Sequence, residues 1–219
     1  MEQLLEVAVF LFLIVPGMIL SLFAISQGTL SFVLAAVSTI VQDLALVSLV
    51  LFLLWHNGEP RVRIGWTLRH GWREAALGVL LFIPLIIAAA LLENAFRAAG
   101  LSGPPTAPSF LAAKGTAQII LAFILVVVVA IAEETIFRGY LILRFKGVTN
   151  NIVVAVLLSA AVFSLGHTYE GTAGVATVGL IGVALAVVYV WRRSLIAPMM
   201  MHFLLDFISV VLLPALGAS

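Results

Sequence analysis

The 219-residue sequence contains no cysteine and only two aspartates, Asp43 and Asp206. The absence of cysteine excludes disulfides, thiolate metal ligands and a cysteine nucleophile. Two aspartates on separate segments argue against an aspartyl catalytic pair. The sequence also lacks H-E-x-x-H, which places two zinc ligands on a helix, and G-x-S-x-G, the nucleophile elbow of many serine hydrolases. Any hydrolytic chemistry must therefore use other groups.

Charged residues are scarce as well. They make up 10% of the chain and hydrophobic residues make up 63%, whereas a soluble domain has about 25% charged and about 45–50% apolar residues. The net charge of +1 is too small to indicate nucleic-acid binding. The composition predicts an integral, multi-pass membrane protein. With no composition shift or long-period repeat to divide it, the chain is expected to form one membrane-embedded domain, residues 1–219.

Long apolar runs support this prediction, because about 20 apolar residues in a helix cross a bilayer. The predicted spans cover residues 4–25, 30–55, 75–92, 115–145, 151–166, 171–191 and 194–213, with a short turn at 26–28 and a Pro-rich connector at 101–114. The fold class is therefore an all-α, polytopic transmembrane helix bundle of about seven spans. Residues 1–97 would hold accessory spans, and residues 115–213 would form the core.

The basic residues predict the orientation, because Lys and Arg gather in cytoplasmic connectors. The second, fourth and sixth connectors contain, in order, Arg61, Arg63, Arg69 and Arg73; Arg144 and Lys146; and Arg192 and Arg193. The third connector has only Arg97 and Lys114. This alternation predicts a cytoplasmic amino terminus.

Within the predicted core, an uncharged apolar run over residues 119–132 leads directly into Glu133, Glu134 and Arg138. An ionisable group at this depth costs roughly 2.5–3.5 kcal/mol on insertion scales, which makes such groups functional candidates. On a helix, Glu134 and Arg138 share a face and can pair, whereas Glu133 lies on a neighbouring face. One carboxylate is therefore expected to be neutralised, and the other is left for chemistry.

Two further spans contribute polar groups. His167 ends the fifth span, and His202 and Asp206 lie four residues apart on the seventh. Together with Glu133, they offer a general base for water and hydrogen-bond donors for an oxyanion, which suits hydrolysis. The same carboxylates and imidazoles could bind a metal, and the two charged pairs could instead be structural. We interpret Asp43, in the second span, as a structural hydrogen-bonding residue outside the site.

At these residues the sequence resembles a known family. The segment E-E-T-I-F-R-G-Y-L, residues 133–141, is similar to the E-E-x-x-x-R-G motif of the CPBP intramembrane proteases. This family includes CAAX prenyl endopeptidases and the bacteriocin-processing and self-immunity proteins of the Abi group. Two further segments, F-S-L-G-H at 163–167 and H-F-L-L-D at 202–206, resemble the family's second and third motifs. All three occur in the family's order, each on a separate predicted span.

The resemblance implies an intramembrane endopeptidase of the glutamate type. Glu133 would activate water with help from His167, and Glu134 and Arg138 would form a positioning pair. His202 and residue 206 would stabilise the oxyanion. The prenyl-processing branch usually has Asn at this last position. Because an ionised Asp cannot donate a hydrogen bond, we expect Asp206 to orient and charge His202 instead.

The resemblance also implies a peptide or protein substrate, anchored in the membrane, and no cofactor. The short chain is similar to bacterial members of the family, so a bacterial inner membrane is the expected location. Two alternatives remain. An inactive family member would bind or regulate a membrane partner, and a proton-coupled transporter would use the same buried acids and histidines. The absence of an evident inverted repeat with broken helices makes the transporter less favoured.

Overall fold

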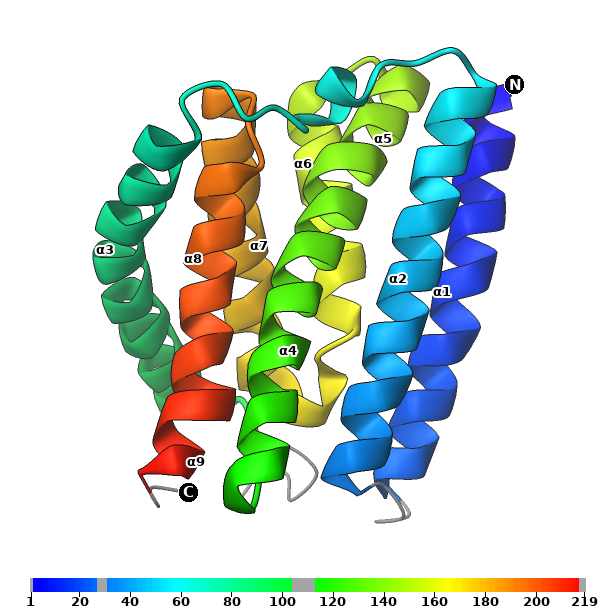
Figure 1. The fold of residues 1–219 in the computed structure, drawn as a ribbon. Helices are drawn as coiled ribbons and strands as arrows, with labels where there is room; N and C mark the ends of the chain where they lie inside the picture. Colours follow the sequence, from blue (N-terminus) through cyan, green and yellow to red (C-terminus); the bar gives the residue numbers. More distant parts are fainter. Residues whose placement is uncertain (1, 27–30, 104–112, 217–219) are drawn as a thin grey trace.

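A computed structural model of the chain describes residues 2–26, 31–103 and 113–216 (Figure 1). All the regular elements in these residues are helical. The first four are α1 (Glu2–Ser26), α2 (Phe32–His56), the 3₁₀ turn η1 (Arg61–Ile64) and α3 (Gly71–Ala98). A continuous helical run follows, made of α4 (Gly115–Glu133), the π-helical segment η3 (Glu134–Leu141) and α5 (Ile142–Thr149).

The remaining elements complete the bundle. They are α6 (Ile152–Leu165), the 3₁₀ turn η4 (Thr168–Glu170), α7 (Gly171–Arg192), α8 (Ile196–Asp206), the π-helical segment η5 (Phe207–Leu212) and α9 (Leu213–Ala215). Six helical runs are long and apolar enough to cross a membrane, and α6 is a shorter apolar helix. The predicted all-α, polytopic bundle of about seven spans is confirmed. The predicted turn at 26–28 and most of the predicted Pro-rich connector lie outside the described residues.

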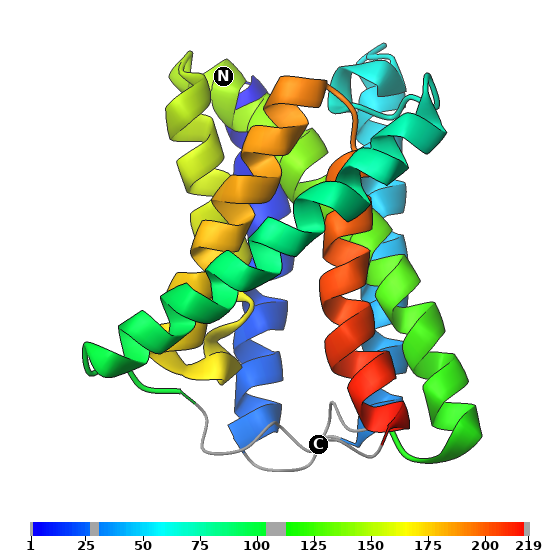
Figure 2. The ribbon, with the colours of Figure 1, turned by 90° about the vertical axis from the view of Figure 1, so that its left-hand side faces the viewer.

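The helices run roughly side by side, with α1 and α2 at one end of the row and α3 at the other (Figure 1). Between them, α4 packs against both α2 and α8. Helix α8 also packs against α3, which crosses the bundle obliquely (Figure 2), and α6 packs against α5 and α7. The first motif begins at the last residue of α4 and continues through η3, and the third motif lies in α8, which packs against α4.

Local sequence features position α6, which carries the remaining motif. Asn151 caps its first turn, because the side-chain Oδ1 accepts hydrogen bonds from the backbone N–H groups of Val153 and Val154, at 2.9 and 3.2 Å. Gly182 of α7 lets the two helices approach closely. A methyl group at this glycine would lie 3.2 Å from the ring of Phe163, so the small residue leaves room for that ring.

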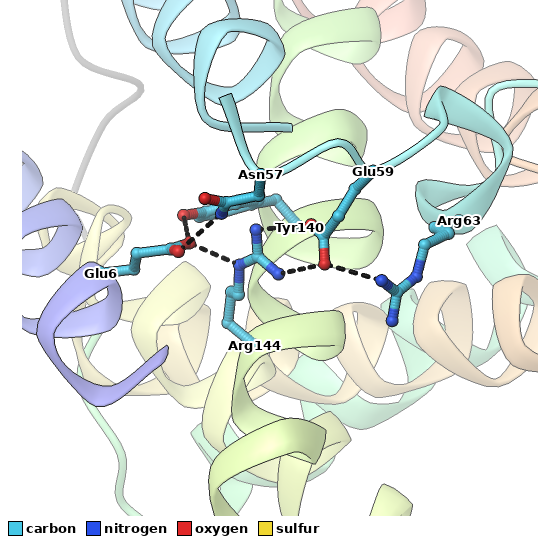
Figure 3. A network of polar contacts seen from close by, with 6 residues as sticks. All are labelled: Glu6, Asn57, Glu59, Arg63, Tyr140 and Arg144. Atoms are coloured by element: carbon cyan, nitrogen blue, oxygen red, sulfur yellow. Dashed lines mark hydrogen bonds and ion pairs between the residues drawn. The ribbon is translucent and has the colours of Figure 1, made fainter. Parts of the chain in front are cut away.

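One predicted assignment is wrong. The charge pattern placed Arg144 in the fourth connector, but Arg144 lies within α5 and is only 1% exposed. Its guanidinium lies between two carboxylates (Figure 3). Nε lies 2.7 Å from Glu6 of α1, and the two Nη atoms contact Glu59 at 3.1 and 2.7 Å. Burial of a charge requires such partners, and they lie far away in the sequence.

Three more side chains extend this cluster. Tyr140 and Asn57 donate hydrogen bonds to Glu6 at 2.9 and 2.7 Å, and Arg63 donates to Glu59 at 2.7 Å (Figure 3). We call the six residues the Arg144 network. It links α1, the connector after α2 and the end of the motif-bearing helix.

Candidate active site

The site is built around the point where the long central helix changes from α-helical to π-helical. Glu133 is the last residue of α4, and Glu134 is the first residue of the π-helical segment η3. π-Helical turns inside α-helices are frequent at functional sites. All residues from Glu134 to Leu141 are buried, so the motif lies in the interior of the bundle rather than on a lipid-facing surface.

Neighbouring elements support the π-helical segment. The hydroxyl of Ser159, on α6, donates a hydrogen bond of 2.6 Å to the carbonyl of Phe137. The indole N–H of Trp66, in the connector after η1, donates to Thr135 at 3.0 Å. Because a buried backbone group left without a partner is costly, the Ser159 bond stabilises this irregular stretch.

Glu134 lies at the centre of the buried polar groups. Its Oε1 is 3.0 Å from Nη1 of Arg138 and 2.8 Å from Nδ1 of His202. Glu134 and Arg138 are 0% and 1% exposed. A carboxylate paired with a guanidinium accepts a hydrogen bond from an imidazole N–H. Glu134 therefore joins α8 to the central helix and fixes the orientation of the His202 ring.

The other nitrogen of His202 faces two acids. Nε2 lies 3.6 Å from Oε2 of Glu133 and 3.4 Å from Oδ2 of Asp206. These two side chains are 21% and 29% exposed, whereas the His202 side chain is 6% exposed. Asp206 was expected to orient His202. In the structure, Glu134 makes the short contact with Nδ1, and Asp206 lies on the same side of the ring as Glu133.

Phe163 connects the second histidine to this group. Its ring centroid lies 5.0 Å from that of His167 and 5.9 Å from that of His202, and the guanidinium of Arg138 is 4.1 Å from it. Phe163 thus contacts both histidines and forms a cation–π contact with Arg138. Phe163 begins the F-S-L-G-H segment, but an apolar residue on an apolar helix is usually core, so the residue type did not predict these contacts.

His167 lies just after α6, where Nδ1 is 3.2 Å from the carbonyl oxygen of Phe163. When Nδ1–H donates to this carbonyl, Nε2 becomes the acceptor nitrogen. Burial lowers the pKa of His167 from its ordinary value, which favours this neutral form. A neutral imidazole with an acceptor nitrogen can take a hydrogen bond from water.

Sequence reasoning left out one acid that lies close to the site. Asp43 of α2 is 7% exposed and interacts electrostatically with Glu133 and His202. Its Oδ2 has no hydrogen-bond partner among the described residues, so this atom does not make the structural hydrogen bond that we expected. An acid within an apolar span was the available signal, and it is the same signal that identified Glu133.

Within residues 2–26, 31–103 and 113–216, no three His, Asp or Glu side chains are grouped closely enough to hold a metal ion. Carboxylates lie near both ring nitrogens of His202. Such an arrangement provides carboxylates that accept protons and an imidazole that donates them.

The fold and the site together define a polytopic helical membrane protein with buried carboxylates, histidines and an arginine inside its bundle. Residues 115–208 match the family model for type II CAAX prenyl endopeptidase Rce1-like proteins. The predicted resemblance to the CPBP and CAAX protease family is confirmed, and the matched segment contains all six predicted site residues. This family is one of membrane-embedded peptidases. No curated protein and no solved structure matches the chain.

Proposed function

We propose that this protein is an intramembrane endopeptidase that hydrolyses a peptide bond near a membrane-associated segment of its substrate, with Glu133 as the group that activates water. The observation that carries the proposal is the arrangement around Nε2 of His202, with Glu133 at 3.6 Å and Asp206 at 3.4 Å. A partly exposed carboxylate beside an imidazole N–H supplies both a base and a donor where a peptide carbonyl could bind.

The proposed reaction begins with a water molecule that Glu133 activates with help from His167. Glu133 removes a proton from the water as its oxygen bonds to the peptide carbonyl carbon. The carbonyl oxygen then carries negative charge, and Nε2–H of His202 donates a hydrogen bond to it. As the carbon–nitrogen bond breaks, the proton held by Glu133 moves to the leaving nitrogen. The products are a carboxylic acid, which keeps the second proton of the water until it ionises, and an amine.

Three other residues would position these groups. Glu134 fixes the His202 ring through its 2.8 Å contact with Nδ1, and Arg138 neutralises Glu134. Asp206 lies beside Nε2 and stabilises a protonated imidazole. An ionised Asp206 would weaken the binding of an oxyanion. We therefore propose that Asp206 interacts with His202 rather than with the substrate.

The test is cleavage of lipid-anchored peptides that carry a fluorophore and a quencher, with purified protein in detergent or liposomes. We expect Glu133→Gln to reduce the rate by roughly 10²- to 10⁴-fold, the usual contribution of a general base. Glu93→Gln is the matched control. This partly exposed glutamate pairs with Arg97 at the end of α3, so its variant should cleave like the wild type.

Three outcomes would contradict the proposal. Unchanged cleavage by Glu133→Gln would remove Glu133 from the reaction. Cleavage lost on addition of a chelator and restored by a metal ion would indicate metal-dependent hydrolysis. No cleavage of any peptide by a wild-type protein that still captures those peptides would indicate a binding or regulatory protein.

A further inference from the structure

Asp43 is a buried acid that the proposed reaction does not use. It lies in the middle of α2, a helix long and apolar enough to cross a membrane. The guanidinium of Arg138 is paired with Glu134, and no lysine or arginine among the described residues forms an ion pair with Asp43. A buried carboxylate without such a partner is costly, so another group must compensate for the burial of Asp43.

The packing of α2 beside α4 determines which group Asp43 faces (Figure 1). One buried cluster joins the start of α2 to α4 through Phe32, Ala36, Ala122 and Val126. A second buried cluster includes, from the end of α2 and from η3, Val50, Leu54, Ile136 and Tyr140. Asp43 lies about two helical turns from the nearest α2 residue of each cluster, and Glu133 lies midway in sequence between Val126 and Tyr140. The two clusters therefore place Asp43 at the level of Glu133.

Each of these two acids has a buried oxygen without a hydrogen bond. The atoms are Oδ2 of Asp43 and Oε2 of Glu133, and neither has a hydrogen-bond partner within the part of the chain that the structure describes. Asp43 interacts electrostatically with Glu133 on α4 and with His202 on α8. Two ionised carboxylates cannot satisfy each other, because both only accept hydrogen bonds, whereas a protonated carboxyl group can donate one.

The balance of charge around His202 also favours such a proton. The acids that interact with His202, by contact or through space, are Asp43, Glu133, Glu134 and Asp206. Arg138 balances Glu134, and a protonated His202 balances one acid more. Asp43 is buried, whereas Glu133 and Asp206 are partly exposed, so a negative charge is least solvated on Asp43. Buried carboxyl groups that lie together share a proton rather than ionising together.

We propose that Asp43 is a positioning residue of the site, and that its carboxylic acid donates a hydrogen bond to the buried oxygen of Glu133, directly or through one water molecule. This hydrogen bond turns the other oxygen of Glu133 toward the water that it activates, and it keeps Glu133 ionised. Asp43 retains its proton throughout, so the proton balance of the proposed hydrolysis is unchanged. The pairing stands on burial and helix packing, whereas its role in catalysis rests on the proposed function.

Infrared spectroscopy tests the pairing without any turnover. A protonated carboxyl group has a C=O stretching band at a higher frequency than the bands of a carboxylate. We expect the wild-type protein in liposomes at neutral pH to show such a band, which shifts in D2O and is absent in Asp43→Asn. Glu93→Gln is the control, because this partly exposed acid pairs with Arg97 and should contribute only carboxylate bands.

A second comparison identifies the acceptor of that proton. Glu133→Gln replaces a charged acceptor with a neutral one, so we expect the Asp43 band to move, measured as the difference between Glu133→Gln and the double variant with Asp43→Asn. Identical carboxylic-acid bands in the wild type and Asp43→Asn would show that Asp43 is ionised and would overturn the proposal. An Asp43 band that Glu133→Gln leaves unchanged would also overturn it, because the acceptor would then be another group.

Cleavage of the lipid-anchored peptides tests the role in catalysis. Asp43→Leu removes the donor, and we expect kcat to fall by roughly 10- to 100-fold with little change in KM, because Asp43 positions Glu133 and not the substrate. Asp43→Asn keeps a donor of similar size and should recover most of kcat. Gln42→Leu is the matched control. Gln42 lies on the exposed face of the same helix, so this variant should cleave like the wild type.

The two experiments fail in different ways. Equal losses of kcat in Asp43→Leu and Asp43→Asn, or no loss in Asp43→Leu, would overturn the positioning role. A wild-type protein that shows the Asp43 band but cleaves no peptide would contradict the proposed function and leave the pairing supported. Cleavage that depends on Glu133, in a protein without the Asp43 band, would support the proposed function and overturn the pairing.

Discussion

At the scale of single residues, His202 links most of the polar groups in the site. Nδ1 contacts the ion pair of Glu134 and Arg138, and Nε2 faces Glu133 and Asp206. Because Nδ1 is held by a buried carboxylate, the ring cannot rotate without breaking a charge-assisted hydrogen bond. Glu134 and Glu133 therefore lie at opposite edges of the same imidazole, so we expect the loss of each interaction to have a different effect on the protein.

The first prediction compares these glutamates through thermal stability in detergent. Arg138→Ala leaves Glu134 buried without its guanidinium, which we expect to cost about 3–5 kcal/mol and to lower Tm clearly. Glu133→Gln removes a partly exposed charge and should change stability by less than about 1 kcal/mol. Equal loss of Tm in both variants would contradict the division into a positioning glutamate and a water-activating one.

The second prediction concerns His167 and pH. Its pKa is lowered by burial, so the folded protein takes up a proton at this ring less readily than the unfolded chain. Below the ordinary value of 6.5, the unfolded state binds more protons, and stability falls as pH falls. We expect Tm to drop between about pH 7.5 and about pH 5, and to drop less in His167→Gln. An equal drop in both proteins would show that His167 does not contribute.

At the scale of elements, the π-helical segment η3 depends on contacts from outside its own helix. Ile64 and Trp66 approach it from the connector between α2 and α3, and Ser159 approaches it from α6. At Gly139, the glycine of the E-E-x-x-x-R-G motif, the backbone of Ile64 in this connector comes close to η3. A close approach of two backbones requires a residue without a side chain.

The third prediction follows from this approach. In Gly139→Ala, the added methyl group would lie 2.9 Å from the carbonyl oxygen of Ile64 and 3.1 Å from its Cβ. Removing this clash requires a shift of the connector. We expect the free energy of unfolding to fall by about 1–3 kcal/mol, measured as a fall in Tm. Gly179→Ala on α7 is the control, because its methyl group would meet Ser164 at an ordinary 3.6 Å. If Tm fell as much in Gly179→Ala as in Gly139→Ala, the close approach at Gly139 would not explain the loss of stability.

At the scale of the whole molecule, the Arg144 network holds the amino-terminal helix to the motif-bearing helix. Arg144 is buried, and its two carboxylate partners come from residues 138 and 85 positions away in the sequence. Buried charges are tolerated when they are paired on all sides. The network therefore fixes where α1 meets α5.

The fourth prediction removes the centre of this network. Arg144→Met leaves Glu6 and Glu59 without their shared cation, and we expect a loss of roughly 3 kcal/mol with a lower Tm. Lys146→Met, on the same helix, removes a charge from an exposed side chain and should change Tm little. Similar Tm values for the two variants would show that the network does not hold α1 in place.

The sequence by itself determined the class of protein, the spans and the three motifs, because apolar run length and residue identity are local properties. The sequence also predicted the pair of Glu134 and Arg138, because residues four positions apart on a helix are neighbours. The tertiary structure decided which residues meet across helices. It buried Arg144, brought Asp43 near Glu133, placed Phe163 against both histidines and turned Nδ1 of His202 toward Glu134. Spans that are apolar on every face carry no periodicity to set their rotation about their own axes, so only packing against neighbouring helices fixes these contacts.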